Sequence, residues 1–221
     1  MLQSKVQEDS YLHKGMRAQL INTLRGKGIR DEKVLTAMNA VPRHFFLDTA
    51  FERIAYEDRA FQILAKQTIS HPYTVAYQTE LLEIKKFDKV LEIGTGSAYQ
   101  SCVLAEMGAQ VFSIERQREL YDYVGNFFFI KKYATIKRFY GDGYAGLPSY
   151  APFDKIIVTA GAPYVPEKLI SQLKPGGIFV IPVGDDKGQK MLRITKEIDH
   201  KIVTEEMGNF DFVPMLEGKN S

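Results

Sequence analysis

The most constraining feature of this sequence is an apolar run of strand length that ends abruptly in a glycine-rich turn. The run Val90–Ile93 is followed by Gly94-Thr95-Gly96-Ser97, and an amphipathic segment of helical character begins immediately afterwards. Glycines let a backbone approach a ligand closely, and the free N–H groups at a helix start favour a polar or anionic group. The segment therefore predicts a strand, a ligand-binding loop and a helix in direct succession.

An acidic residue follows at the spacing that a nucleoside site requires. The next strand-like run, Val111–Ile114, is followed by Glu115, about 20 residues after the glycine loop. In doubly wound α/β proteins a carboxylate at this place binds a ribose hydroxyl. A lone pair of glycines is more often an ordinary turn, but the strand, the helix and Glu115 together favour a ligand that contains a nucleoside.

The residue at the third glycine position of dinucleotide-binding loops helps to distinguish between nucleoside ligands. A third glycine lets helix and strand close around a pyrophosphate, whereas this chain has Tyr99 there. The bulky ring argues against NAD, so a nucleotide-dependent dehydrogenase is a distant alternative. S-adenosylmethionine is the common adenosine cofactor without phosphates, and we expect it to be the cofactor.

Composition and charge indicate an ordinary globular domain. The chain has 221 residues, enough for one continuous core, and its 29 Lys and Arg and 27 Asp and Glu give a net charge of +2. The charges are dispersed, so we expect neither nucleic acid nor a membrane as a partner. No segment is apolar over the length of a membrane span, and residues 1–9 lack the apolar stretch of a secretory signal.

The single cysteine, Cys102, excludes an intramolecular disulfide and agrees with a reducing compartment. We expect Cys102 to be a buried structural residue in a cytoplasmic, monomeric protein. The histidines show no metal-ligand spacing, so we expect no metal site; they are His13, His44, His71 and His200.

From residue 90 onward, short apolar runs alternate with segments of helical periodicity. This alternation predicts a doubly wound, mostly parallel seven-stranded α/β sheet of the Rossmann-like type. We expect strands at Val90–Ile93, Val111–Ile114, Ile136–Tyr140, Lys155–Thr159, Ile178–Val183, Met191–Thr195 and Phe210–Pro214, and helices at Ser97–Met107, Arg118–Lys131 and Pro166–Leu173. The last two strands have no helix between them, so we expect them to pair antiparallel at the sheet edge.

The first third of the chain is helical in its periodicity. Helices are expected at Met16–Leu24, at Glu32–Ala40 with Asp31 as its cap, and at Tyr73–Ile84. We expect these helices to form a flank on the sheet. The single domain over residues 1–221 would then consist of an N-terminal part, 1–88, with the helices and a substrate loop, and a Rossmann-like core, 89–221.

Ligands of open α/β sheets lie beyond the carboxyl ends of the strands, so the residues that follow each strand are candidates. After the third strand comes Gly141-Asp142-Gly143. An Asp-Gly turn is the ordinary explanation, but at this edge the Asp142 carboxylate could accept a hydrogen bond from the amine of adenine.

The fourth strand is followed by Thr159-Ala160-Gly161-Ala162-Pro163. Methyltransferases that act on nitrogen carry Asn or Asp, two prolines and an aromatic residue here, so we expect an acceptor other than nitrogen. Small residues with exposed backbone favour pairing with an extended peptide, which makes Ala160 and Gly161 candidate substrate contacts.

Segments spread over nearly the whole chain resemble, in order, the protein-L-isoaspartate (D-aspartate) O-methyltransferase family, which has the class I S-adenosylmethionine-dependent methyltransferase fold. Gln67-Thr68-Ile69-Ser70 is the family-specific segment. The others are Val41–Arg43, Tyr56–Asp58, Leu91–Ser97, Gly141–Gly143, Pro152–Ala160, Leu173–Gly177 and Phe212–Pro214. The resemblance implies methylation of the free carboxylate of L-isoaspartyl residues in damaged proteins and peptides, whose ester then closes to a succinimide.

The resemblance also implies roles for individual residues. The catalytic residue would be Ser70, the substrate contacts Gln67, Thr68, Ile69, Ala160 and Gly161, and the cofactor contacts Gly94, Thr95, Gly96, Ser97, Glu115, Arg116, Asp142 and Gly143. Family members often carry glycine at the position of Ala98, and we expect the alanine to be tolerated if its φ is negative. His71 also departs from the family pattern, and it could be a solvated loop residue or a substrate contact.

Carboxylate methylation requires alignment more than acid–base chemistry. A carboxylate is already ionised at neutral pH, so it needs no general base. Charge decreases toward the transition state, which favours a single neutral hydroxyl, that of Ser70, over strong ionic contacts. Without the resemblance, Ser70 is better explained as a helix cap. Two other functions stay open: an O-methyltransferase for another carboxylate or a hydroxyl, and a non-catalytic isoaspartyl- or cofactor-binding protein.

Overall fold

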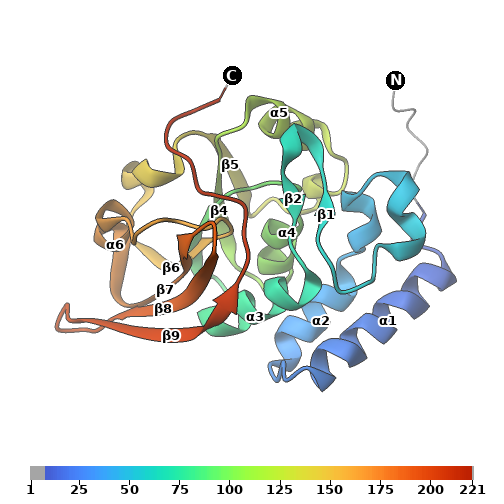
Figure 1. Ribbon diagram of the computed structural model, residues 1–221, viewed down its shortest axis with the longest axis horizontal. Coiled ribbons are helices and arrows are strands. Elements are labelled where there is room, and N and C mark those ends of the chain that lie inside the picture. Colours follow the sequence, from blue (N-terminus) through green and yellow to red (C-terminus); the bar gives the residue numbers. More distant parts are fainter. Residues whose placement is uncertain (1–7, 221) are drawn as a thin grey trace.

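A seven-stranded sheet forms the centre of the protein in a computed structural model that describes residues 8–220 (Figure 1). Its strands are β3 (Lys89–Ile93), β4 (Gln110–Glu115), β5 (Ile136–Tyr140), β6 (Phe153–Val158), β7 (Leu173–Asp185), β8 (Gly188–Lys196) and β9 (Ile202–Phe210). Residues 1–7, part of the segment considered for a secretory signal, and Ser221 lie outside the described residues.

The strand order is β5-β4-β3-β6-β7-β8-β9. Strands β5 to β7 pair in parallel, whereas β7, β8 and β9 pair antiparallel. The chain therefore moves outward from β3 to β4 and β5, and then returns to continue on the other side at β6. This confirms the predicted doubly wound sheet, and the reversal between β3 and β6 opens a crevice at their carboxyl ends.

Alternate side chains of the central strands face opposite sides of the sheet, as the two-residue period of a strand requires. On one face, residues such as Val90 and Val111 pack against α3 (Pro72–Leu82) and α4 (Tyr99–Glu106). On the other face, Leu91, Ile156 and Phe179 pack with Leu169 of α6 (Glu167–Gln172). Helices on both faces explain why the residues of these strands are mainly apolar.

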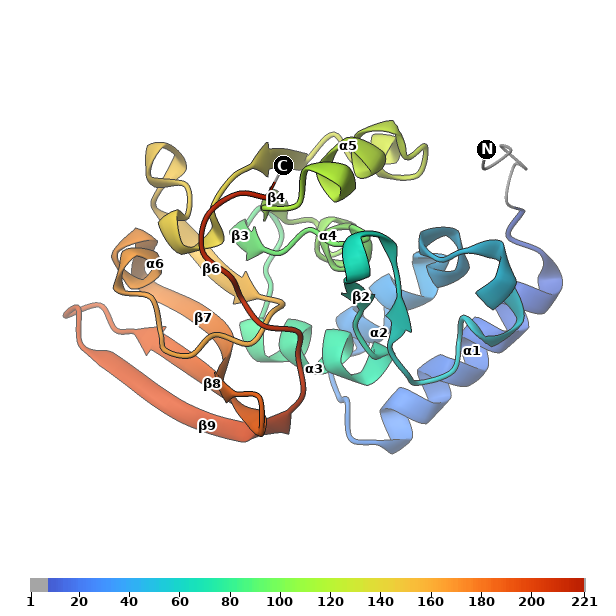
Figure 2. The same ribbon diagram turned by 45° about the horizontal axis from the view of Figure 1, so that its top comes forward.

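The N-terminal part packs beside α3 and α4, at the opposite end of the molecule from β9 (Figures 1 and 2). It consists of α1 (Tyr11–Gly26), α2 (Glu32–Ala40), the 3-10 helices η1 (Arg43–Phe46) and η2 (Thr49–Ile54), and a hairpin of β1 (Phe61–Gln62) and β2 (Thr68–Ile69) that encloses η3 (Leu64–Lys66). Asp31 caps α2 as predicted, since its side chain accepts the N–H of Lys33.

One hydrophobic cluster contains residues from both parts of the chain. Leu24 and Val34 of the N-terminal helices belong to the same cluster as Tyr99 and Cys102 of α4. Cys102 is fully buried, as expected. Part of residues 8–88 therefore shares a hydrophobic core with helix α4. The assignment of residues 1–221 to one domain, divided at residue 88, stays a prediction.

Two predicted elements differ from the structure. The predicted last strand, Phe210–Pro214, is wrong because β9 covers Ile202–Phe210. Strand β9 is an edge strand with mostly exposed residues, so its sequence lacks apolar alternation. The apolar residues 212–214 instead follow β9 and cross the carboxyl edge of the sheet, as the C-terminal segment in Figures 1 and 2 shows.

The predicted helix Arg118–Lys131 is also shorter in the structure. Helix α5 covers Arg118–Asn126, and the 3-10 helix η4 (Ile130–Lys132) follows it; further 3-10 helices are η5 (Gly143–Ala145) and η6 (Pro148–Tyr150). Phe127 and Phe129 both pack against Phe46 of the N-terminal part. Residues two positions apart on a regular helix point to nearly opposite sides, so Phe127 and Phe129 could not both face Phe46 if the helix continued through them.

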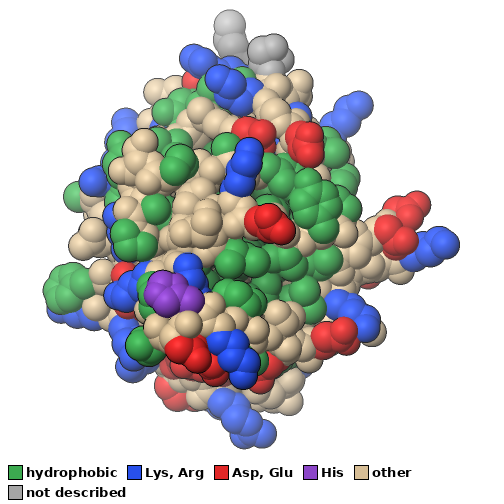
Figure 3. Space-filling view, turned by 90° about the vertical axis from the view of Figure 1, so that its left-hand side faces the viewer, with side chains coloured by type: hydrophobic (Ala, Val, Ile, Leu, Met, Phe, Trp, Pro, Cys, Tyr) green, Lys and Arg blue, Asp and Glu red, His purple; other side chains and the backbone are tan. Residues whose placement is uncertain are grey.

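Among residues 8–220, no helix combines the length and hydrophobicity that crossing a bilayer would require. The face that presents α6 and the β8–β9 hairpin carries basic and acidic side chains side by side, around a patch of hydrophobic ones (Figure 3). On this face the charges are therefore mixed, in agreement with their dispersal along the sequence.

Candidate active site

A cleft lies at the carboxyl ends of β3 and β4, at the reversal point of the sheet, and encloses about 910 Å³ with its open mouth included. Its walls are the glycine loop after β3, the end of β4, the β2 segment with Ser70, and the C-terminal segment Val213–Leu216.

The cleft brings together most of the residues that the sequence predicted for the site. The predicted cofactor residues that line it are Gly94, Thr95, Gly96, Ser97, Glu115, Arg116 and Gly143, and the predicted substrate and catalytic residues that line it are Gln67, Thr68, Ile69, Ser70 and Ala160. Asp142 and Gly161 are not among the lining residues.

The carboxylate of Glu115 connects the glycine loop to the end of β4. Its Oε2 accepts the N–H of Gly96 at 2.9 Å and its Oε1 accepts the N–H of Gln117 at 2.8 Å. Burial raises the pKa of Glu115, and these backbone hydrogen bonds oppose that increase. Because each carboxylate oxygen can accept a second hydrogen bond, Glu115 can still receive the hydroxyl groups of a ribose.

Arg116 lines the cleft but is directed at the chain's own C-terminus. Its Nε donates to the carbonyl of Gly218, and its Nη2 donates to that of Glu217. Asn220 pairs with the backbone beside Arg116 as well. Arg116 therefore holds the C-terminal segment against the end of β4, and a direct contact between its side chain and the cofactor stays a prediction.

The backbone of Gly161 is already paired within the chain. Its N–H donates to Val213 at 2.8 Å, and its carbonyl accepts the N–H of Met215 at 2.7 Å. The expectation that Gly161 offers a free backbone to a substrate peptide is therefore wrong. Only its neighbour Ala160 lines the cleft.

Asp142 begins the 3-10 helix η5, where its Oδ1 accepts the N–H of Tyr144 at 3.0 Å. This is the ordinary turn contact that the sequence analysis weighed against adenine binding. Oδ2 has no hydrogen bond within the described residues, and the adjacent Gly143 lines the cleft. Adenine binding through Oδ2 stays a prediction.

The glycine loop requires positive φ angles, and Ala98 is one of the residues that must adopt them. Gly94 has φ +96°, and a Cβ there would lie 2.6 Å from Oγ1 of Thr159. Ala98 has φ +69° at the N-cap of α4. The assumption that φ stays negative at Ala98 is therefore wrong, and the left-handed conformation is one that glycine adopts with less strain than alanine.

A buried carboxyl group connects the strand before the glycine loop to the helix that follows the loop. Glu92 is fully buried in β3; the hydroxyl of Ser101 donates to its Oε2, while its Oε1 has no partner among the described residues. Burial raises the pKa of Glu92 to about 7. An ionised carboxylate with an unpaired oxygen would be costly in this place, so the side chain retains its proton to near-neutral pH.

The guanidinium of Arg43 is the buried centre of the neighbouring substrate loop. It donates to three carbonyls: Nε to Ala55 at 3.1 Å, and Nη2 to Arg59 at 3.3 Å and to Ser70 at 2.8 Å. It also lies over the ring of Tyr99, 5.1 Å from the ring centroid. Burial lowers the pKa of Arg43 to about 10, so the group stays charged at neutral pH.

This contact gives a structural reason for the tyrosine at the third glycine position. The ring of Tyr99 is 2 % exposed and packs edge-on against Phe46 as well as under Arg43. Tyr99 begins α4 directly after the glycine loop. It therefore joins the cofactor loop to the loop that carries Ser70.

The hydroxyl of Ser70 has no hydrogen-bond partner among the described residues, although its carbonyl is held by Arg43. The N-cap of α3 is His71, whose side chain makes no capping hydrogen bond. The alternative explanation of Ser70 as a helix cap is therefore wrong. His71 is exposed and borders a separate groove rather than the cleft.

Several cleft residues were not predicted as site residues. They are Val75, Ile93, Tyr99, Gln100, Ile114, Gln117, Thr159 and residues 213–216. Gln100 is buried, and its Oε1 has no hydrogen-bond partner in the described part of the chain, while its Nε2 donates to Thr79. An unsatisfied buried acceptor on a cleft wall suits a ligand with a donor, such as the ammonium group of S-adenosylmethionine. Phe212–Pro214 in the family resemblance was the only signal for the C-terminal segment.

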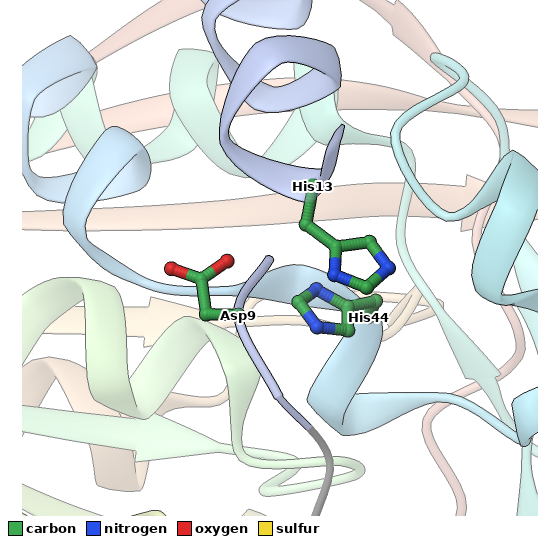
Figure 4. A group of neighbouring side chains, drawn as sticks. All are labelled: Asp9, His13 and His44. Atoms are coloured by element: carbon green, nitrogen blue, oxygen red, sulfur yellow. The ribbon is translucent and has the colours of Figure 1, made fainter. Parts of the chain in front are cut away.

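Among residues 8–220, one group outside the cleft has the composition of a metal site, namely Asp9, His13 and His44 (Figure 4). The two imidazole rings lie face to face, with centroids 3.8 Å apart and planes 20° from parallel. Ring lone pairs lie in the ring plane, so stacked rings cannot both direct a nitrogen at one ion. The carboxylate of Asp9 instead pairs with Arg17.

We predict that Arg43→Lys lowers the free energy of unfolding by about 2–4 kcal/mol, because an ammonium cannot replace three directed hydrogen bonds and a stacked plane. Urea denaturation measures the change. Arg25→Lys is the matched control, since Arg25 forms an exposed pair with Glu32 and should change stability little. Equal effects of the two substitutions would contradict the role of Arg43.

We predict that Glu92→Gln changes how stability depends on pH. Because the folded pKa of about 7 exceeds the unfolded value near 4.5, the wild type loses stability as pH rises between these values. The glutamine variant lacks this loss, which amounts to roughly 3 kcal/mol. Urea denaturation of both proteins at pH 5 and pH 8 gives the change in the free energy of unfolding. An equal change in the wild type and in Glu92→Gln would contradict this prediction.

Comparison with known proteins assigns the chain to a family. Residues 15–220 match the family protein-L-isoaspartate(D-aspartate) O-methyltransferase (PCMT). The protein-L-isoaspartate O-methyltransferase of Christiangramia forsetii is 56% identical over 213 residues, which cover 96% of this chain and 100% of that protein. That of Cytophaga hutchinsonii is 56% identical over 209 residues, covering 95% of this chain and 94% of that protein.

A solved structure has the same fold. A Plasmodium falciparum structure described as a protein-L-isoaspartate O-methyltransferase in complex with S-adenosyl-L-homocysteine superposes with a TM-score of 0.78 and 25% identity, covering 92% of this chain and 98% of that chain. The predicted class I S-adenosylmethionine-dependent methyltransferase fold is thereby confirmed. The chain belongs to the protein-L-isoaspartate(D-aspartate) O-methyltransferase family.

Proposed function

We propose that this protein transfers the methyl group of S-adenosylmethionine to the free carboxylate of L-isoaspartyl residues in damaged proteins and peptides. The resulting ester would close to a succinimide and reopen partly to normal aspartate. The observation that carries the proposal is that the family-specific segment ending in Ser70 lines the same cleft as the glycine loop and Glu115. Family membership supports the substrate class.

S-adenosylmethionine, when bound, supplies an electrophilic methyl group. In the proposed arrangement Glu115 receives the ribose hydroxyls with its remaining lone pairs, and Gln100 accepts from the ammonium group with its unpaired Oε1. Asp142 binds the adenine amine with Oδ2, and Gly143 provides the surface beside it. The glycine loop brings its backbone close to the ligand.

Ser70 orients the acceptor carboxylate. Arg43 fixes the backbone of Ser70 through its carbonyl, so the serine hydroxyl is held at the cleft while remaining free to donate. A neutral donor aligns one carboxylate oxygen without stabilising the anion strongly in the ground state. Positioning of this kind can contribute roughly 7–11 kcal/mol in well-aligned reactions.

The composition of the cleft suits a reaction without a general base. Among the described residues that line it, Glu115 is the one carboxylate, and histidine is absent. Both oxygens of Glu115 already accept backbone N–H groups, so Glu115 is poorly suited to remove a proton. An ionised carboxylate as acceptor requires no such group.

We predict that Ser70→Ala lowers kcat for an isoaspartyl peptide about 10- to 100-fold, the cost of one hydrogen bond to a charged group. The affinity for S-adenosylmethionine should be unchanged. Ser70→Thr keeps a hydroxyl and should recover most of the rate. Equal losses of turnover and cofactor affinity in Ser70→Ala would mean that Ser70 has a structural role.

We predict that Glu115→Gln and Asp142→Asn raise the Kd of S-adenosylmethionine about tenfold each, because each replaces an acceptor oxygen by an amide that donates. Isothermal titration calorimetry measures the affinity, and thermal unfolding checks the fold. Wild-type affinity in both variants would refute these cofactor contacts.

Some sequence-based expectations stay predictions. They are the cytoplasmic location, the monomeric state, and the absence of nucleic acid and membrane partners.

A further inference from the structure

A second groove opens beside the cleft, between the start of α3 and the end of β9, and encloses about 890 Å³ with its mouth included. Its lining includes His71 and Tyr73 from the α3 side, and Phe210 and Asp211 from the end of β9. The reaction described above makes no use of this groove. The side chains that line the groove, and its position beside the cleft, indicate what kind of group it could bind.

Three aromatic rings form one wall of the groove. The rings of Tyr73 and Tyr77 have centroids 5.7 Å apart at 19°, and Phe210 lies at 9° to Tyr73 and 26° to Tyr77. Tyr77 is fixed by its hydroxyl, which donates to the carbonyl of Met207 at 2.8 Å. Near-parallel rings present extended π faces, which attract cations and planar groups.

The charges of the groove leave one carboxylate uncompensated. Lys27 pairs with Asp58 at 2.5 Å, and the other oxygen of Asp58 accepts the N–H of Tyr73 at 2.8 Å. Lys27 also lies 5.8 Å from the ring centroid of Tyr73, so this ring already has a cation near it. Asp211 is exposed, and its carboxylate makes no hydrogen bond or ion pair with any residue of the described chain.

The groove and the cleft are lined by neighbouring residues of the chain. Ser70 lines the cleft and the next residue, His71, lines the groove; likewise Asp211 lines the groove and Val213 lines the cleft. Two segments of the chain therefore form walls of both. Successive Cα atoms are about 3.8 Å apart, and an extended peptide advances about 3.3 Å per residue. A residue close to the isoaspartyl residue in a bound peptide would thus reach the groove.

We propose that this groove is a subsite for an arginine side chain within two residues of the isoaspartyl residue in a peptide substrate. The proposal rests on the proposed function, and it specifies which isoaspartyl sites are preferred. The planar guanidinium lies against the rings of Tyr73 and Phe210 and pairs with the carboxylate of Asp211. A guanidinium suits this site better than an ammonium, because it combines a stacking plane with directed donors.

The test compares isoaspartyl peptides that differ at a single position. Arginine, citrulline or glutamate is placed in turn at each of the two positions on either side of the isoaspartyl residue, and kcat/KM is measured at low salt. Citrulline has the shape of arginine without its charge. We expect arginine to exceed citrulline about five- to tenfold at one position, with glutamate lowest, and the advantage should shrink as salt is added.

Two variants separate the subsite from general charge effects. In Asp211→Asn the advantage of arginine over citrulline should fall below twofold, while kcat/KM for the citrulline peptide stays at the wild-type value. Asp199→Asn is the matched control, since Asp199 is exposed in the turn between β8 and β9 and should leave the preference intact.

The outcomes distinguish the subsite from the reaction. Methylation of all peptides without an arginine preference at any position overturns the subsite alone, as does a preference that survives Asp211→Asn. Absence of methylation on every peptide, the citrulline set included, contradicts the proposed function and the subsite with it.

Discussion

The buried guanidinium of Arg43 is the contact on which the rest of the site depends. It holds the carbonyls of Ala55, Arg59 and Ser70 in one place and lies over the ring of Tyr99, which begins α4 directly after the glycine loop. A single charge thus fixes the substrate loop relative to the cofactor loop. Nη1 of Arg43 has no hydrogen-bond partner among the described residues. Burial of the guanidinium therefore costs desolvation free energy, which the hydrogen bonds to the three carbonyls must offset.

The two sides of the cleft are stabilised in different ways. The cofactor side is built on the carboxyl edge of the sheet, where Glu115 holds the N–H groups of Gly96 and Gln117. The substrate side comes from a short hairpin that is positioned from the N-terminal part. The C-terminal segment forms a further wall, which is held by pairing with Gly161 and with the backbone at residues 116–118. Segments distant in sequence therefore meet only in the folded chain.

The sequence predicted most of the parallel sheet, because strands buried on both faces are mainly apolar. The same signal failed for β9, whose exposed edge position removes the apolar pattern, and it misassigned the apolar residues 212–214, of which Val213 and Pro214 line the cleft instead. Ser70 and Glu115 were predicted from local spacing and resemblance. The backbone pairing of Gly161, the φ of Ala98 and the link from Arg43 to Tyr99 depend on long-range packing that no local pattern encodes.

The most direct measurement of the central claim is timed transfer of a labelled methyl group from S-adenosylmethionine to an isoaspartyl peptide and to its normal aspartyl twin. If the cleft aligns an isoaspartyl carboxylate with the cofactor, label appears on the isoaspartyl peptide and is released later as methanol when the ester closes. The aspartyl twin stays unlabelled. Equal labelling of both peptides, or labelling of neither, would contradict this account.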